Sequence, residues 1–353
     1  MPWDLIGNEQ AVAALRRALE TGAVAHAYLF AGPVQAGKAT LALKLAQALN
    51  CRGGSVTAGA VTYEGAHEPC GECDQCRRIA AGLHPDVQTV TIQTAEDDAQ
   101  RRDISVDQVR EVERAVALNP FEGRSRVIII DPAHALSREA QNAFLKTLEE
   151  PPPRVVFILV TDSESALLPT IRSRCRRLEL RPLPAAAVRE ALLARGLGQE
   201  QAELLARLAR GRIGWALEMA AGPSALESRA EILRDARSLP SLSMAERMAL
   251  AERLAAGFRR DRRALLDTLG EWQGWWRDVL IVQSGAEEAA GNADLLPELR
   301  EDASAYARPP VVAFVQALAS LRRYLTENVQ PRLALEALLL ETPAPPRLPA
   351  SRR

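Results

Sequence analysis

A glycine-rich loop after an apolar strand constrains this chain more than any other feature. Residues 27–31, AYLFA, have the composition of a short buried strand, and Gly32-Pro33-Val34-Gln35-Ala36-Gly37-Lys38-Ala39 follows directly. This run matches the phosphate-binding pattern GxxxxGK[ST] except at its last position. In that pattern the glycines let backbone N–H groups curl around a phosphate, and the lysine supplies positive charge. The order of strand, loop and helix therefore predicts a parallel α/β domain derived from a phosphate site.

The first half of the chain alternates between strand-like and helix-like hydrophobic patterns. Such alternation indicates a parallel sheet covered by helices. Two helices carry end signals, because Ser105 and Gln108 have capping-box spacing and Pro151 stops the helical segment 137–150. Five short segments have the composition of strands, namely residues 27–31, 87–92, 126–130, 155–160 and 176–180.

The second half of the chain has only helical spacing. Strand signals end near residue 181, and Gly222-Pro223-Ser224 later interrupts the helical pattern. We therefore expect three domains and a tail. They are an α/β domain over residues 1–181, a small helical domain over 182–223, a larger helical domain over 224–342 and a Pro-rich flexible tail over 343–353.

Charge and composition exclude several classes of protein. The chain has 353 residues with 44 Lys+Arg against 45 Asp+Glu, so no overall positive field attracts nucleic acid. With 47% hydrophobic and 25% charged residues it is globular rather than disordered. No apolar run approaches the roughly 18 residues of a membrane span, and the N-terminus lacks a signal-peptide pattern. We therefore expect a cytoplasmic protein with no membrane contact.

Four of the five cysteines fall in one short region. They form C-x18-C-x2-C-x2-C in an insertion between the phosphate-loop helix and the second predicted strand. In a cytoplasmic protein such a cluster favours metal ligation over disulfides. Four thiolates complete the tetrahedral shell of Zn²⁺ and leave no position for a catalytic water. We therefore predict a structural zinc module over residues 51–76, with the ligands Cys51, Cys70, Cys73 and Cys76.

The phosphate loop has two chemical defects. Ala39 has no hydroxyl for Mg²⁺, and Thr40, one residue further along the helix, points about 100° away. Asp131 closes a predicted strand, but Pro132 stands where ATPases of this kind carry a glutamate base. Mg²⁺ binding and hydrolysis should therefore be impaired, whereas the sequence leaves ATP or ADP binding open. The nucleotide-binding residues that remain are Gly32, Gly37, Lys38 and Asp131.

Several motifs together resemble a known family, the bacterial clamp-loader AAA+ subunits of DNA polymerase III. Within it the pattern is most similar to the delta-prime branch, whose phosphate site is typically degenerate, whereas gamma/tau motors keep an intact loop. The resemblance implies an AAA+ domain with a zinc-binding insertion, a helical lid and a helical collar. The resemblance covers nearly the whole chain. Its motifs in the first half are HAYLFAGP-VQAGKA, the four cysteines, His84-Pro85-Asp86, ISVDQVR, NAFLKTLEEPP and IRSRC. In the collar they are WWRD (275–278) and NVQPRLALEALLL (328–340).

The resemblance also implies roles for single residues and partners. Ser173-Arg174-Cys175 matches the family's SRC motif, so Arg174 is implied to be an arginine finger that reaches ATP on a neighbouring subunit. Gly214 lies where a nucleotide-sensing arginine would be expected. The implied protein is a stator in the DNA polymerase III holoenzyme, not an active ATPase by itself. Its implied partners are the gamma/tau and delta subunits, the sliding clamp and primer-template DNA.

Two other functions fit parts of the sequence. An active gamma/tau-type ATPase would use Lys38 and Asp131 with a base from elsewhere, and turnover by the isolated chain would reveal it. A zinc-dependent nucleic-acid-binding module would show salt-sensitive DNA binding that is lost with Cys73→Ser. Its footprint would be the arginines near the cysteines, Arg77, Arg78, Arg101 and Arg102.

Overall fold

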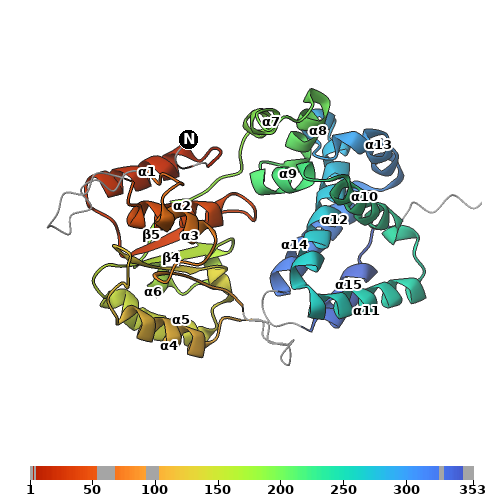
Figure 1. Ribbon diagram of the computed structural model, residues 1–353. Coiled ribbons are helices and arrows are strands. Elements are labelled where there is room, and N and C mark those ends of the chain that lie inside the picture. The colour runs from red at the N-terminus through yellow and green to blue at the C-terminus, as the bar shows by residue number, and fades with distance from the viewer. Residues whose placement is uncertain (1–2, 4, 54–67, 93–102, 326–329, 345–353) are drawn as a thin grey trace, which may run out of the picture. The chain divides into compact units, whose positions relative to one another are not determined.

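The computed structural model describes residues 3, 5–53, 68–92, 103–325 and 330–344 (Figure 1). The chain divides into two compact units. The α/β unit comprises Met1–Ala191 and Gly211–Trp215, and the helical unit comprises Leu192–Arg210 and Ala216–Arg353. The three-domain boundaries drawn from the sequence remain a prediction.

The α/β unit is built around a sheet of five parallel strands in the order β2-β3-β4-β1-β5. The central strands β1 and β4 are buried along their whole length, which explains their continuous apolar composition. Each predicted strand is present and begins at the expected residue, so the predicted α/β class is confirmed. The strands are β1 (Ala27–Ala31), β2 (Val87–Val90), β3 (Arg126–Ile130), β4 (Val155–Thr161) and β5 (Arg176–Glu179).

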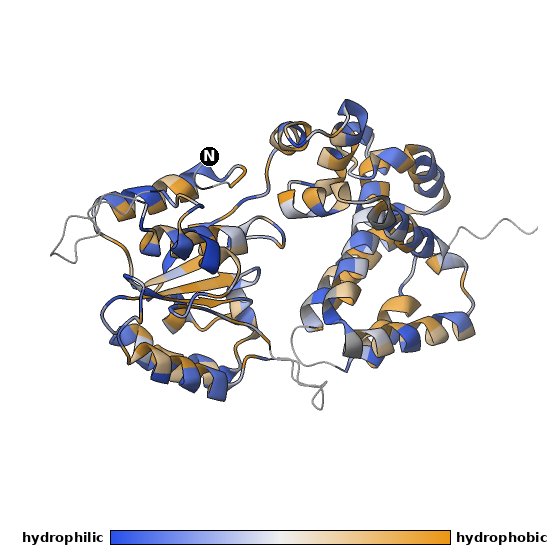
Figure 2. Cartoon of the chain, in the orientation of Figure 1, coloured by the Kyte–Doolittle hydropathy of each residue, from blue (hydrophilic) through white to orange (hydrophobic). Residues whose placement is uncertain are grey.

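Side chains on the sheet alternate between two apolar layers, because successive residues of a strand point to opposite faces. Phe30 and Ile158 pack with helices α1, α2 and α3, while Leu29 and Phe157 pack with helices α4 and α5 on the other face (Figure 1). Figure 2 shows hydrophobic strands between helices of mixed colour. The helices are α1 (Glu9–Glu20), α2 (Lys38–Asn50), α3 (Asp74–Ala80), α4 (Val106–Val116), α5 (Arg138–Glu149), the short α6 (Pro169–Arg172) and α7 (Ala185–Leu193).

Helices α4 and α5 begin as the sequence predicts. The Ser105 hydroxyl accepts a hydrogen bond from the Gln108 N–H at 3.3 Å, and the Gln108 side chain accepts one from the Ser105 N–H at 3.1 Å. This reciprocal pair is the predicted capping box. Ser137 caps α5 in the simpler way, and α5 ends at Glu149, before the prolines. Between these ends α5 packs against one face of the sheet, through Phe144 and Leu148.

The helical unit packs around three fully buried tryptophans, Trp272, Trp275 and Trp276. They lie on the long helix α12 (Arg262–Gln283), which packs against α10, α11, α13 and α14. In the described part of this unit every regular element is helical, as the spacing predicts. No described helix is long and apolar enough to span a bilayer. The other helices of the helical unit are α8 (Gln199–Ala209), α9 (Ile213–Ala220, shared with the α/β unit), α10 (Pro223–Ser238), α11 (Met244–Arg260), α13 (Leu296–Ala305), α14 (Arg308–Tyr324) and α15 (Pro331–Leu340).

Candidate functional site

The glycine-rich loop leaves the sheet between β1 and α2, at the edge where the strands end. Two of its residues have backbone conformations that favour glycine. Gly32 has a φ of +149°, and a Cβ there would lie 2.1 Å from the Leu180 carbonyl oxygen. Gly37 has a φ of +93°, a backbone conformation that L side chains rarely adopt. Glycine therefore suits both positions in the turn between β1 and α2, and the phosphate-binding role of the loop remains a prediction.

The Lys38 ammonium group hydrogen-bonds to the backbone of this loop. Its Nζ donates hydrogen bonds to the carbonyl oxygens of Gly32 and Pro33, at 2.7 and 2.6 Å, and the residue is buried. Burial lowers the pKa of the Lys38 ammonium, and the nearby carboxylates of Asp162 and Asp131 oppose that shift. The lysine side chain is thus held by the backbone of the glycine-rich loop.

Two carboxylates follow the neighbouring strands at the same edge. Asp131 comes directly after β3, and Asp162 comes directly after β4 and pairs with His134 Nδ1 at 2.8 Å. Although burial acts to raise the pKa of Asp162, the hydrogen bond and the charge of His134 lower it. Our sequence reasoning singled out Asp131 but missed Asp162, which carries the same signal of an acidic residue ending a buried strand.

The first turn of α9 covers the phosphate loop directly. The Gly214 N–H donates to the Gln35 carbonyl oxygen at 2.9 Å. A Cβ at Gly214 would lie 3.0 Å from that oxygen and 3.1 Å from Gln35 Cβ, so a larger side chain has little room. The position at which the resemblance led us to expect an arginine is therefore a close backbone contact. Sequence spacing alone cannot reveal this contact.

Arg174 lies between the short helix α6 and strand β5, as predicted. Its Nη1 donates to the Thr170 carbonyl oxygen at 3.0 Å, and its Nη2 donates to Glu149 Oε1 at 2.6 Å. The Arg174 side chain remains 34% exposed. Glu149 belongs to one of the motifs that carried the resemblance, but the sequence gave no sign of its pairing with Arg174.

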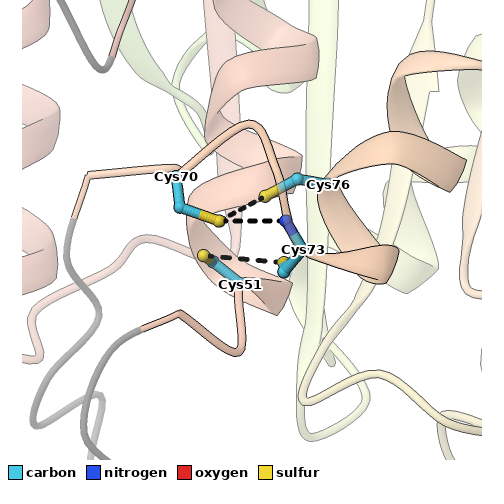
Figure 3. Close-up of side chains that lie close together, drawn as sticks. All are labelled: Cys51, Cys70, Cys73 and Cys76. Atoms are coloured by element: carbon cyan, nitrogen blue, oxygen red, sulfur yellow. Dashed lines mark hydrogen bonds between the residues drawn. The ribbon is translucent and has the colours of Figure 1, made fainter.

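The four clustered cysteines converge on one point, and their sulfur atoms lie within 4.8 Å of one another (Figure 3). The Cys51–Cys73 and Cys70–Cys76 sulfur pairs are each 3.9 Å apart. A tetrahedral zinc site with Zn–S bonds near 2.3 Å has sulfur–sulfur edges of about 3.8 Å. A disulfide needs a sulfur–sulfur distance near 2.05 Å. The group can therefore hold a metal ion in the geometry that zinc prefers.

The electrostatics of the cysteines also suit a cation. Burial acts to raise the pKa of the Cys73 thiol, but hydrogen bonds from the backbone N–H groups of Cys76 and Arg52 lower it to about 6. Burial raises the pKa of Cys51 and of Cys76, so these thiols need a bound cation to ionise near neutral pH. Gln47 of α2 donates to the Cys76 carbonyl oxygen at 2.8 Å and fixes the module to the phosphate-loop helix.

Of the arginines that follow the cysteines in the sequence, Arg78 forms ion pairs with acidic residues. Arg78 pairs with Glu122 at 2.5 Å and with Asp74 at 3.8 Å, so acidic neighbours balance its charge. Arg101 and Arg102 lie outside the described residues. The proposed nucleic-acid footprint therefore gains no support from Arg78.

Comparison with known proteins decides the family. Residues 7–184 match the family model described as DNA polymerase III, delta subunit. The chain is 34% identical to DNA polymerase III subunit delta′ of Pseudomonas aeruginosa, over 90% of this chain and 91% of that protein. It belongs to the DNA polymerase III clamp-loader family. The subunit is similar to delta′, as the sequence motifs predict.

Other relatives lie in both branches of the clamp-loader family. Delta′ of Bacillus subtilis is 27% identical over 92% of this subunit. The tau subunit of Escherichia coli is 32% identical over 98% of this subunit, which spans only 54% of tau. Among solved structures, a gamma subunit-related protein of Thermotoga maritima covers 94% of this subunit at 19% identity and a TM-score of 0.45.

Proposed function

We propose that the chain is a delta-prime-like stator of the replicative clamp loader. In this role it helps to load the sliding clamp onto primer-template DNA, in a complex with gamma/tau and delta subunits. It supplies Arg174 to ATP held by a neighbouring subunit and hydrolyses little or no ATP itself. The observation that supports this proposal most is a contrast: Ala39 and Pro132 deprive the chain's own site of a hydroxyl and a base, whereas Arg174 is partly exposed and oriented.

The chain's own nucleotide site lacks what hydrolysis requires. Ala39 offers no oxygen to Mg²⁺, and Pro132 offers no base to an attacking water. Gly214, where the resemblance leads us to expect an arginine, instead makes a close backbone contact with Gln35. Gly32, Gly37, Lys38 and Asp131 would hold any bound ATP or ADP, but the usual hydroxyl and the usual glutamate are missing from their positions.

Arg174 has the chemistry that a trans-acting residue needs. A planar guanidinium has five N–H donors and stabilises negative charge that develops on a transferred phosphoryl group. Two of its groups are engaged by Thr170 and Glu149, which leaves further N–H donors for a phosphate. The residue therefore can act on a ligand that this chain does not itself hold.

The four cysteines fit zinc, and we propose that zinc is the resident metal. Bound by four thiolates, Zn²⁺ would have no open coordination position, so it supplies structural cross-linking rather than catalysis. Cys51 follows α2 and Cys76 lies within α3, so the ion would tie the two helices together. This would make the insertion a rigid part of the α/β unit.

The first prediction tests the stator. We expect the purified chain to show no ATP turnover, and its complex with cognate tau-type and delta subunits, clamp and primed DNA to be active. Arg174→Ala should assemble normally but lower the stimulated ATPase by about tenfold or more. The reason is that the negative charge on the phosphoryl group in the transition state would no longer be stabilised by the guanidinium. Steady-state phosphate release and gel filtration give the two readouts.

The matched control is Arg172→Ala, which removes an exposed arginine two residues earlier in the chain and should leave the ATPase unchanged. Equal ATPase rates for Arg174→Ala and wild type, in a complex of normal composition, would contradict the finger assignment.

The similarity to tau favours a second candidate, an active motor. Identity of 32% over nearly the whole chain, together with the presence of Lys38 and Asp131, is compatible with that role. The motor predicts ATP turnover by the isolated chain, abolished by Lys38→Ala. The stator predicts no turnover in either form.

A further inference from the structure

Helix α5 holds the segment that carries Arg174 at two separated points. The first point is Gln141, which is buried. Its Nε2 donates to the Ala166 carbonyl oxygen at 3.2 Å, and its Oε1 accepts from the Leu168 N–H at 2.8 Å. These bonds fix the backbone that leads into α6.

Apolar packing fixes α6 itself. Ile171 is fully buried and Leu167 nearly so, and both belong to the apolar layer that contains Phe144 and Leu148 of α5. The Arg174 N–H donates to the Ile171 carbonyl oxygen at 3.1 Å, so the backbone at Arg174 continues from this anchored turn. The backbone of the arginine is therefore rigidly placed relative to α5.

The second point of contact is Glu149, the last residue of α5. Its Oε1 accepts from Arg174 Nη2 at 2.6 Å, while the Thr170 carbonyl oxygen accepts from Nη1. A carboxylate at a helix C-terminus is disfavoured by the helix dipole, so Glu149 does not stabilise α5 by its charge. Its favourable contact is with the guanidinium. Glu150, the next residue, makes no ion pair within the described part of the chain.

We propose that Glu149 is a positioning residue for Arg174. This inference rests on the proposed function, because it concerns how the finger is presented. Without a side-chain partner, an exposed arginine samples many rotamers of its four torsions. Fixing one rotamer in the transition state then costs conformational entropy, which slows the reaction. Glu149 and the Thr170 carbonyl hold two of the guanidinium's edges. The remaining N–H donors then face a phosphate of the neighbouring subunit in one orientation.

The test uses the complete complex with cognate tau-type and delta subunits, clamp and primed DNA. We expect Glu149→Ala to lower kcat of the stimulated ATPase about fivefold, the upper range for an exposed ion pair, with KM for ATP unchanged. Glu149→Gln keeps an oxygen acceptor and should retain an intermediate kcat. Glu150→Ala removes a neighbouring carboxylate that has no ion-pair partner among the described residues, and it should match wild type.

A double-mutant cycle separates positioning from general damage to the fold. If Glu149 acts through Arg174, then Glu149→Ala causes no further loss in an Arg174→Ala background. A further fivefold loss in that background would overturn the proposal, as would an unchanged or raised kcat for Glu149→Ala alone. If instead Arg174→Ala leaves the ATPase intact, the proposed function itself has failed, so the two failures are distinguishable.

Discussion

Asp86 is buried within a turn of backbone N–H groups. Its carboxylate accepts hydrogen bonds from the N–H groups of Phe121, Glu122 and Gly123 at 2.7 to 2.8 Å, and it pairs with Arg126 at 3.0 Å. Burial acts to raise the pKa of Asp86, but these bonds outweigh it and lower the pKa to about 2. One side chain therefore fixes the turn that leads toward β3.

We predict that Asp86→Asn destabilises the fold by about 2–3 kcal/mol at neutral pH, because an amide cannot accept all of these hydrogen bonds. The folded pKa of Asp86 lies below its ordinary value of 3.8. The stabilisation from its ionised form is therefore complete above that value and disappears as pH falls through about 2. About half of it should be lost by pH 3.

Urea unfolding at pH 7 and pH 3 measures this dependence as the difference in unfolding free energy between wild type and Asp86→Asn. Asp107→Asn is the control, since that carboxylate is 80% exposed and should change stability by less than about 0.5 kcal/mol. If the difference in unfolding free energy between wild type and Asp86→Asn were the same at both pH values, the lowered pKa of Asp86 would be contradicted.

At the scale of elements, the capping box of α4 is a sequence signal whose contribution to the free energy of unfolding can be measured. We predict that Ser105→Ala costs about 1 kcal/mol, since it leaves the Gln108 N–H without its acceptor at the start of the helix. Thermal or urea denaturation gives the value. Ser304→Ala removes an exposed hydroxyl that, among the described residues, bonds only back to the Arg300 carbonyl oxygen within α13, and it should cost much less. Equal costs for the two variants would contradict the capping role of Ser105.

The elements themselves were predictable because hydrophobic period and end signals are local. Segments such as 126–130 became strands because both faces of the sheet are covered, and α5 stopped before its prolines. The contacts of Asp86 with Phe121, of Gln35 with Gly214 and of Glu149 with Arg174 join residues distant in the chain. No local pattern encodes such pairs, so the sequence placed the candidate residues but not the bonds that hold them.

At the scale of the whole molecule, the two units have separate cores. The apolar layers of the sheet contain only residues of the α/β unit, and the tryptophan core contains only residues of the helical unit. The four cysteines proposed to bind zinc lie in the α/β unit, and the buried carboxylate of Asp278 lies in the helical unit. Asp278 accepts hydrogen bonds from the backbone N–H and the side chain of Asn292 and pairs with Arg210 at 3.1 Å.

We therefore predict that chelation of zinc lowers the Tm of the α/β unit and leaves that of the helical unit in place, because metal binding stabilises only the fold that contains its ligands. Asp278→Asn should do the reverse, since it removes the charge of a fully buried carboxylate that pairs with both Arg210 and Arg277. Calorimetry detects both transitions, and tryptophan fluorescence reports chiefly the helical unit, which holds three of the five tryptophans.

Metal analysis after dialysis distinguishes this effect from a general effect of the chelator. Cys73→Ser should reduce bound zinc and reproduce the chelation shift, whereas Cys175→Ser, outside the cluster, should retain the metal. If chelation and Asp278→Asn each moved both transitions together, the units would unfold as one cooperative body. The zinc module would then stabilise the helical unit as well, because its binding energy would enter a single unfolding equilibrium.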